Sequence, residues 1–231
     1  MIQIVDYGAG NLFSVQNALN YLQIENKVTA DPAELDKADG IILPGVGAFR
    51  DAMQMLNRSG FTEAIKEQAA QGKPLLGICL GMQIAAIEFA RNVLGYRDAN
   101  SSEFDPESVH RVIDLMPDQY GVKMGGTMRL GAYPCKVRPG SIMASAYGAE
   151  LISERHRHRY EFNNAFREEI ESRGMLITGT SPTGELVETV EIPEHPFYIG
   201  VQFHPEFKSR PNRAHPLFKA FVAASLKRSK K

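Results

Sequence analysis

Cys79 is the residue whose surroundings are most typical of a nucleophile. It stands in Gly77-Ile78-Cys79-Leu80-Gly81, with a glycine two positions away on each side, between a strand-like and a helix-like stretch. The pattern is a nucleophile elbow with Cys in place of Ser, a sharp turn that raises the side chain above the carboxyl edge of a sheet. The N-terminus of the following helix favours a thiolate, and the Leu80 N–H could donate to a developing oxyanion. A buried core cysteine is the alternative interpretation.

A thiolate that attacks an amide needs a base that later serves as an acid, and His204 is the best candidate among the six histidines. It follows a long apolar stretch and precedes Pro205, which favours an extended backbone at His204. In an extended chain Glu206 can reach one imidazole nitrogen while the other faces Cys79. The sequence therefore predicts a triad of Cys79, His204 and Glu206. A purely structural His-Pro-Glu turn is the alternative.

The segment Arg155–Arg159 alternates arginine with histidine, so in a strand the arginines share one face and the histidines the other. A solvated basic edge explains most of these residues. The functional alternative is that one arginine holds a substrate carboxylate through paired hydrogen bonds. Zinc binding by the histidines is not expected, because no third ligand lies at a suitable spacing. Cys135, in a strand-like stretch, is predicted to be structural.

The elements that must position these side chains alternate in the first half of the chain. Short apolar runs predict strands at 2–5, 40–43 and 74–79. Helical spacing predicts helices after Asn11, which could cap the first one, at 48–58 and 62–71, and after Cys79. Strands alternating with helices imply right-handed crossovers and a mainly parallel sheet. The predicted class is therefore α/β.

The second half of the chain does not show this alternation of strand and helix patterns. Residues 93–110, rich in Asn, Ser, Asp and Pro, are expected to form a loop. Strands are predicted at 127–138, 142–153, 175–180, 184–192 and 197–203, the first two in an antiparallel region, and a final amphipathic helix at 217–226. No linker divides the 231 residues, so a single domain is expected.

Composition narrows the function classes. The formal net charge of −1 argues against nucleic acid or an anionic membrane as the main partner. Two cysteines make no disulfide framework, and no apolar run of about 18 residues is present. A cytoplasmic protein is expected, with no cofactor.

The residues around Cys79, together with His204 and Glu206, resemble the class I glutamine amidotransferase family over nearly the whole chain. That family has an α/β, flavodoxin-like fold, in which helices flank a mainly parallel central sheet that carries an added antiparallel region. The resemblance is composite. Residues 1 to about 83 resemble the glutaminase subunit of imidazole glycerol phosphate synthase, through the motifs at 5–12, 43–49 and 77–83.

Residues from about 77 onward resemble instead the glutaminase domain of CTP synthase, through the motifs at 77–91, 125–131, 154–163 and 200–216. The two patterns overlap at 77–83. The hypothesis that follows is an engineered chimera, with residues 1–83 from one family, 84–231 from the other, and a join near the elbow.

The resemblance implies hydrolysis of L-glutamine to glutamate and ammonia. Cys79 would form a γ-glutamyl thioester, and His204, oriented by Glu206, would act as base and then acid. The CTP synthase pattern implies that four further residues hold the glutamine. Among them Arg159 suits the α-carboxylate and Glu103 the α-ammonium. The other two are Gln83 and Tyr160.

The chain departs from the CTP synthase pattern in the oxyanion strand, where Gly45 is followed by Val46 rather than by a second glycine. A β-branched residue resists positive φ, so the peptide is less free to point an N–H at the oxyanion formed beside Leu80. Weak activity of the isolated chain is therefore expected.

Ammonia delivery is the second open point. The histidine-pathway resemblance implies docking on a (βα)₈ cyclase, but there a Lys directly follows the His-Pro-Glu, whereas here Phe207 precedes Lys208. The CTP synthase resemblance implies a ligase domain, and none is recognisable in this sequence. Two other functions stay open: an inert scaffold that keeps the fold and binds glutamine or a partner, and a hydrolase or peptidase that acts on γ-glutamyl peptides.

Overall fold

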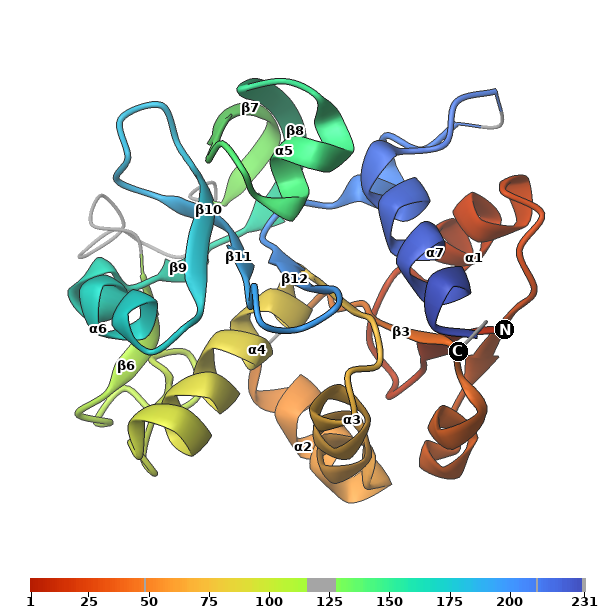
Figure 1. Ribbon diagram of the computed structural model, residues 1–231. Helices are drawn as coiled ribbons and strands as arrows, with labels where there is room; N and C mark the ends of the chain where they lie inside the picture. The colour runs from red at the N-terminus through yellow and green to blue at the C-terminus, as the bar shows by residue number, and fades with distance from the viewer. Residues whose placement is uncertain (48, 116–127, 211, 230–231) are drawn as a thin grey trace.

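The alternating first half of the chain builds a parallel sheet, as the sequence predicts (Figure 1). The computed structural model describes residues 1–47, 49–115, 128–210 and 212–229. The parallel strands lie in the order β2 (Asn26–Thr29), β1 (Ile2–Val5), β3 (Gly40–Leu43), β4 (Leu75–Ile78) and β12 (Tyr198–Val201). β1, β3 and β4 are buried throughout, as is usual for parallel strands covered on both faces.

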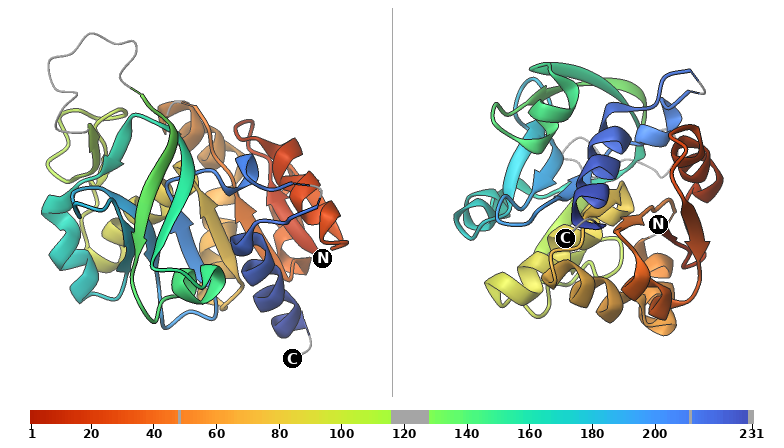
Figure 2. Two further views of the ribbon diagram at one scale, coloured as in Figure 1. Left: turned by 90° about the horizontal axis from the view of Figure 1, so that it is seen from above. Right: turned by 45° about the vertical axis from the view of Figure 1, so that its right-hand side comes forward.

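Four antiparallel strands extend the sheet beyond β12, so that it has nine strands in all. They are β11 (Val187–Glu191), β10 (Leu176–Thr180), β7 (Arg129–Val137) and β8 (Leu151–His158). β7 and β8 form a long twisted ribbon along the outer side of this part (Figure 2, left). A separate three-stranded sheet contains β5 (Asn100–Ser101), β6 (Arg111–Leu115) and β9 (Tyr160–Phe162).

Helices cover both faces of the large sheet and enclose two apolar clusters. One face carries α1 (Leu12–Tyr21), α5 (Ile142–Tyr147) and α7 (Pro216–Ser229). The other carries α2 (Phe49–Ser59), α3 (Phe61–Ala70) and α4 (Leu80–Phe89). The shorter helical segments are η1 (Pro32–Lys37), η2 (Ala90–Leu94), η4 (Asn164–Phe166), α6 (Arg167–Ser172) and η5 (Pro205–Phe207). This architecture confirms the predicted α/β fold with a mainly parallel centre and an added antiparallel region.

The strand predicted at 142–153 is wrong, because α5 takes its first half. Ser141 caps this helix by accepting a hydrogen bond from the Ala144 N–H at 2.9 Å. The carboxylate of Glu191, from the distant strand β11, accepts from the N–H groups of Ile142 and Met143. A carboxylate at a helix N-terminus stabilises the first turn of the helix. Because this carboxylate is 49 residues away in the sequence, local strand propensity does not take it into account.

Three smaller predictions also need correction. The expected loop at 93–110 contains the end of η2 and the short strand β5. Asn11 precedes α1, but its side chain makes no capping hydrogen bond. β2 was not predicted, because its residues are half exposed and carry no long apolar run. Ala48 and Thr127, at the ends of two predicted elements, lie outside the described residues.

The carboxyl ends of β1, β3, β4 and β12 meet at one edge of the sheet, where sites form in such folds. β4 pairs with β12, so the parts 1–83 and 84–231 share one sheet at the point where Cys79 follows β4. No described helix has both the length and the apolar character needed to cross a membrane.

Candidate active site

Cys79 occupies a strained turn between β4 and α4. Its φ of 53° and ψ of −102° lie outside the regions that L-residues favour. A Cβ on Gly81 would lie 2.2 Å from the carbonyl oxygen of Leu43, and one on Gly77 would lie 2.8 Å from the backbone of Gly81. The Cys79 N–H donates to the Val201 carbonyl at 2.7 Å. Both glycines are therefore required by close backbone packing, and the turn places the thiol at the sheet edge.

The structure brings His204 and Glu206 together. Nδ1 of His204 and Oε1 of Glu206 lie 2.8 Å apart, and both side chains are buried. The contact does not come from an extended strand, as the sequence argument supposed. His204 is extended, with φ −112° and ψ 90°, but Glu206 lies in the tight turn η5 that Pro205 begins. The ring of Phe207 stacks on the imidazole at 4.6 Å and covers it.

The electrostatic surroundings of His204 favour its protonated form. Burial disfavours the imidazolium, but contact with Cys79 and with the Glu206 carboxylate outweighs that cost and raises the pKa of His204 to about 10. An imidazole that binds a proton this well is suited to take the proton of a thiol beside it. The buried carboxylate fixes the ring orientation and stabilises the charge that forms.

A cavity of about 540 Å³ lies over the elbow and brings most of the predicted site residues together. Those that line it are Val46, Cys79, Leu80, Gln83, Glu103, Arg159 and Tyr160. Gly45, His204 and Glu206 are not part of its lining. His204 and Glu206 are buried, and Cys79 is the member of the predicted triad that lines this cavity.

The residues expected to hold an amino acid come from three separate parts of the chain. Gln83 lies on α4, Glu103 follows β5, and Arg159 with Tyr160 forms the corner between β8 and β9. Burial raises the pKa of Glu103, although the N–H of Phe49, which donates to its carboxylate at 3.0 Å, and the charge of Arg159 oppose the shift. An anion and a cation therefore face one cavity, as the two charged groups of an α-amino acid require.

The segment expected to form the oxyanion strand, Gly45–Val46, is not a strand in the structure, because β3 ends at Leu43. It packs directly on the first turn of α4. A Cβ on Gly45 would lie 2.4 Å from the Cβ of Leu80. The hydroxyl of Tyr7 donates a hydrogen bond to the Pro44 carbonyl at 2.9 Å and so holds the backbone just before Gly45 in place. Among the described non-glycine residues only Gln23 and Cys79 have a positive φ, so Val46 keeps a negative one.

Sequence reasoning missed Gln202, which is fully buried beside Cys79. Its Nε2 donates to Sγ of Cys79 at 3.6 Å, and its Oε1 accepts from Nε2 of Gln83 at 3.1 Å. A usable signal was present, since Gln202 lies two positions before His204, and alternation along an extended chain places these two on one face.

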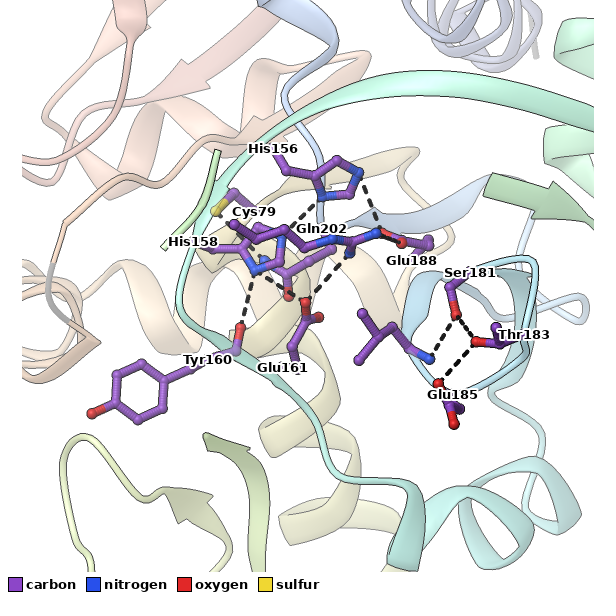
Figure 3. A network of polar contacts seen from close by, with 12 residues as sticks. Cys79, His156, His158, Tyr160, Glu161, Ser181, Thr183, Glu185, Glu188 and Gln202 are labelled. Atoms are coloured by element: carbon purple, nitrogen blue, oxygen red, sulfur yellow. Dashed lines mark hydrogen bonds and ion pairs between the residues drawn. The ribbon is translucent and has the colours of Figure 1, made fainter. Parts of the chain in front are cut away.

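The histidines of the alternating segment belong to a buried polar network (Figure 3). Nδ1 of His156 and Nε2 of His158 are 2.8 Å apart, and Nδ1 of His158 contacts the Tyr160 carbonyl at 3.3 Å. Burial, with the nearby charge of Arg129, lowers the pKa of His156 to about 2 and that of His158 to about 3. Both rings are therefore neutral. No cluster of three metal-ligating side chains occurs in the described ranges.

Arg129 supplies the cation of this network. Its guanidinium lies 2.6 Å from Glu188, 3.4 Å from Glu161 and 4.5 Å from the ring centroid of Tyr133. All three charged side chains are at most 7% exposed. The alternation was predicted correctly, with arginines outward and histidines inward, but the inward face was not recognised as polar.

Comparison with known proteins identifies the family. The family model described as glutamine amidotransferase class-I matches residues 3–224. The chain therefore belongs to the class I glutamine amidotransferases. The CTP synthase of Rubrobacter xylanophilus is 54% identical over 221 residues, which are 94% of this chain and 39% of that protein. The CTP synthase of Halalkalibacterium halodurans is 50% identical over 222 residues, 95% of this chain and 41% of that protein.

A solved structure gives the same result. The glutaminase domain of Trypanosoma brucei CTP synthase with bound acivicin has a TM-score of 0.78 and 35% identity, and the match covers 98% of this chain and 93% of that one. A protein of Thermoplasma acidophilum described as a GMP synthase subunit, at 19% identity and a TM-score of 0.68, shares the fold. The chain is thus similar to CTP synthase glutaminase domains and spans about two fifths of the length of the curated CTP synthases.

Proposed function

We propose that the chain hydrolyses the side-chain amide of L-glutamine to glutamate and ammonia through a thioester on Cys79. The observation that carries this proposal is the strained Cys79 in the lining of a cavity, together with the buried pair of His204 and Glu206, whose Nδ1 and Oε1 atoms are 2.8 Å apart. The relationship to class I amidotransferases supports it. The similarity to CTP synthase glutaminase domains supports glutamine as the amide.

The reaction needs two attacks on one carbon. Cys79 transfers its proton to His204, and Sγ attacks the amide carbon, so that the carbonyl oxygen becomes an oxyanion beside the Leu80 N–H and the segment Gly45–Val46 that follows β3. His204 returns the proton to the nitrogen, and ammonia leaves. Water, deprotonated by His204, then attacks the thioester, and glutamate and the free thiol form. Glu206 keeps the imidazole in the required orientation throughout.

Recognition of glutamine would depend on the charges around the cavity. Arg159 would pair with the α-carboxylate and Glu103 with the α-ammonium, while Gln83 and Tyr160 line the same cavity as Cys79. The direct test is glutamate or aspartate release by the purified chain from L-glutamine, L-asparagine and γ-glutamyl peptides. We expect turnover of L-glutamine to exceed the other two. Faster cleavage of γ-glutamyl peptides would contradict the proposal. A folded chain that releases no glutamate would be an inert scaffold, and protection of Cys79 from alkylation by glutamine would show whether that scaffold still binds glutamine.

Val46 is expected to limit the rate. Because it keeps a negative φ, its peptide is not free to turn toward the oxyanion, and one oxyanion donor is worth roughly 10²–10³ in kcat. The variant Val46→Gly should recover part of this, about tenfold in kcat for glutamine. Val46→Ala, which loses the branch but keeps Cβ, is the matched control and should gain less. Unchanged or lower turnover in Val46→Gly would show that this segment does not limit catalysis.

The ammonia released would be used by a synthase, and the similar proteins suggest which kind of synthase. The named relatives are CTP synthases, so a ligase domain that accepts ammonia is the first candidate partner. The resemblance of residues 1–83 to the histidine-pathway glutaminase suggests a cyclase as the second. Titration of each partner into the chain should raise the glutaminase rate and change sedimentation for the true one. If neither quantity changes for the cyclase, docking on it is rejected.

The chimeric origin of the chain remains a hypothesis beside these proposals. The match to the Rubrobacter CTP synthase covers 94% of the chain, so most of residues 1–83 lies within it as well. The Lys208 side chain, which lies one position later than the Lys of the histidine-pathway pattern, contacts Glu154 of β8 at 3.3 Å and helps to hold the turn that carries Glu206. An unmodified natural gene with this coding sequence would end the chimera hypothesis.

A further inference from the structure

Gln202 is a buried amide whose contacts differ from those of a catalytic base and from those of an apolar core residue. It is fully buried at the end of β12, and its single amide group bonds in two directions. The amide nitrogen donates to Sγ of Cys79, and the amide oxygen accepts from the side chain of Gln83. Its backbone N–H is also used, because it donates to the Glu188 carbonyl at 2.8 Å. The side chain is therefore held in one orientation by its surroundings.

The far end of this contact chain is the corner that carries Arg159. Nε2 of Gln83 donates both to Gln202 and to the carbonyl of Tyr160, the latter at 3.0 Å. The same carbonyl accepts from Nδ1 of His158, which belongs to the buried network (Figure 3). Three elements, α4, the β8–β9 corner and the end of β12, thus meet through two amide side chains and one carbonyl.

The hydrogen bond from Gln202 to Sγ of Cys79 should stabilise the thiolate form of that sulfur. An N–H donor stabilises a negatively charged sulfur more than a neutral one, because hydrogen bonds to charged groups are the stronger ones. During deacylation the same sulfur is the leaving group and regains its negative charge, so the donor favours that step as well. A thioether or hydrocarbon side chain in the same place would fill the space but offer no donor.

We propose that Gln202 is a positioning residue that couples the Cys79 nucleophile to the glutamine-binding corner through Gln83. This inference rests on the proposed glutaminase function for its effect on turnover, but not for its effect on the thiol. Loss of the amide should act in two places at once. The sulfur loses its donor, and Gln83 loses the acceptor that keeps it directed at Tyr160.

The test compares Gln202→Met with Gln83→Met and with the exposed control Gln54→Met. Methionine has nearly the volume of glutamine, so no cavity opens. Iodoacetamide, a small reagent without amino-acid groups, reports on Cys79 alone. We expect Gln202→Met to slow its alkylation at pH 7 by about tenfold and to raise the KM for glutamine. Gln83→Met should raise the KM and slow alkylation by less than Gln202→Met does, because the sulfur keeps its donor but that donor loses the Gln83 N–H that orients it.

The outcomes separate the alternatives. If Gln202→Met alkylates at the parental rate and only its thermal midpoint falls, Gln202 is structural and the proposal is overturned. If alkylation slows while no variant or parent hydrolyses glutamine, the positioning role stands and the proposed function fails. Should Gln202→Met not fold, nuclear magnetic resonance of the ¹⁵N-labelled chain replaces it. The Gln202 side-chain amide protons must then shift upfield in Cys79→Ala, and an unchanged signal overturns the proposal.

Discussion

Replacing Cys79 with alanine is expected to lower kcat for glutamine by at least about 10⁴-fold, since removal of the nucleophile of a triad leaves only the contribution of binding and the oxyanion site. Alanine retains a Cβ, so the variant keeps the strained φ of 53° and the elbow geometry. The loss is therefore chemical rather than conformational. The measurement is glutamate released from L-glutamine by the purified chain, with far-ultraviolet circular dichroism to show that the fold persists.

The second cysteine provides the matched control. Cys135 is fully buried in β7, and burial raises the pKa of its thiol, so it does not react as a thiolate. Cys135→Ala should keep the parental kcat within about twofold and should still be inactivated by iodoacetamide. Residual turnover in Cys79→Ala comparable to the parent would assign the chemistry to another group and remove the basis of the proposed mechanism.

Replacing Arg129 with methionine should cost about 3–5 kcal/mol of unfolding free energy at pH 7, because two buried carboxylates lose their cation. Glu188 and Glu161 lie 2.6 and 3.4 Å from its guanidinium and are at most 3% exposed. A typical domain has about 5–15 kcal/mol in total, so a loss of this size would be visible as a large shift in a denaturant titration. Failure of the variant to accumulate as a folded protein agrees with the same expectation.

The pH dependence of that loss gives a sharper test. Burial raises the pKa of Glu188, while Arg129 opposes the shift, so removal of Arg129 should raise that pKa further. A carboxyl group whose folded pKa exceeds its unfolded one loses stability as the pH rises through the folded pKa. The difference between parent and Arg129→Met should therefore be largest near neutral pH and shrink toward the unfolded glutamate pKa of about 4.3.

Two controls bracket the Arg129 result. Arg129→Lys keeps the charge but loses the fork that spans two carboxylates, so an intermediate loss is expected. Arg155→Met changes an arginine on the exposed face of β8 and should alter stability by no more than about 0.5 kcal/mol. A change below about 1 kcal/mol in Arg129→Met would mean that the network does not depend on its cation.

The turn at Cys79 and the contact between His204 and Glu206 were predictable because they are local. The turn at Cys79 depends on two glycines within two positions, and His204 and Glu206 are separated by one proline. The parallel strands were predictable for a similar reason, since their apolar runs are buried on both faces whatever their order. Cys79 could be predicted from a strand–turn–helix pattern, and the residues on either side of Cys79 show that pattern.

Contacts between distant segments were not predictable in this way. The amide of Gln202 reaches a sulfur 123 positions away, and Gln83 reaches a carbonyl 77 positions away. Whether a polar residue in a strand faces water or a buried charge depends on what packs on that face, as with His156 and Arg129. By itself, the sequence predicted the turn at Cys79, the contact between His204 and Glu206 and the class of fold, because these follow from neighbouring residues. Only the tertiary structure decided which buried polar groups surround them, because strand order and helix packing bring those groups together.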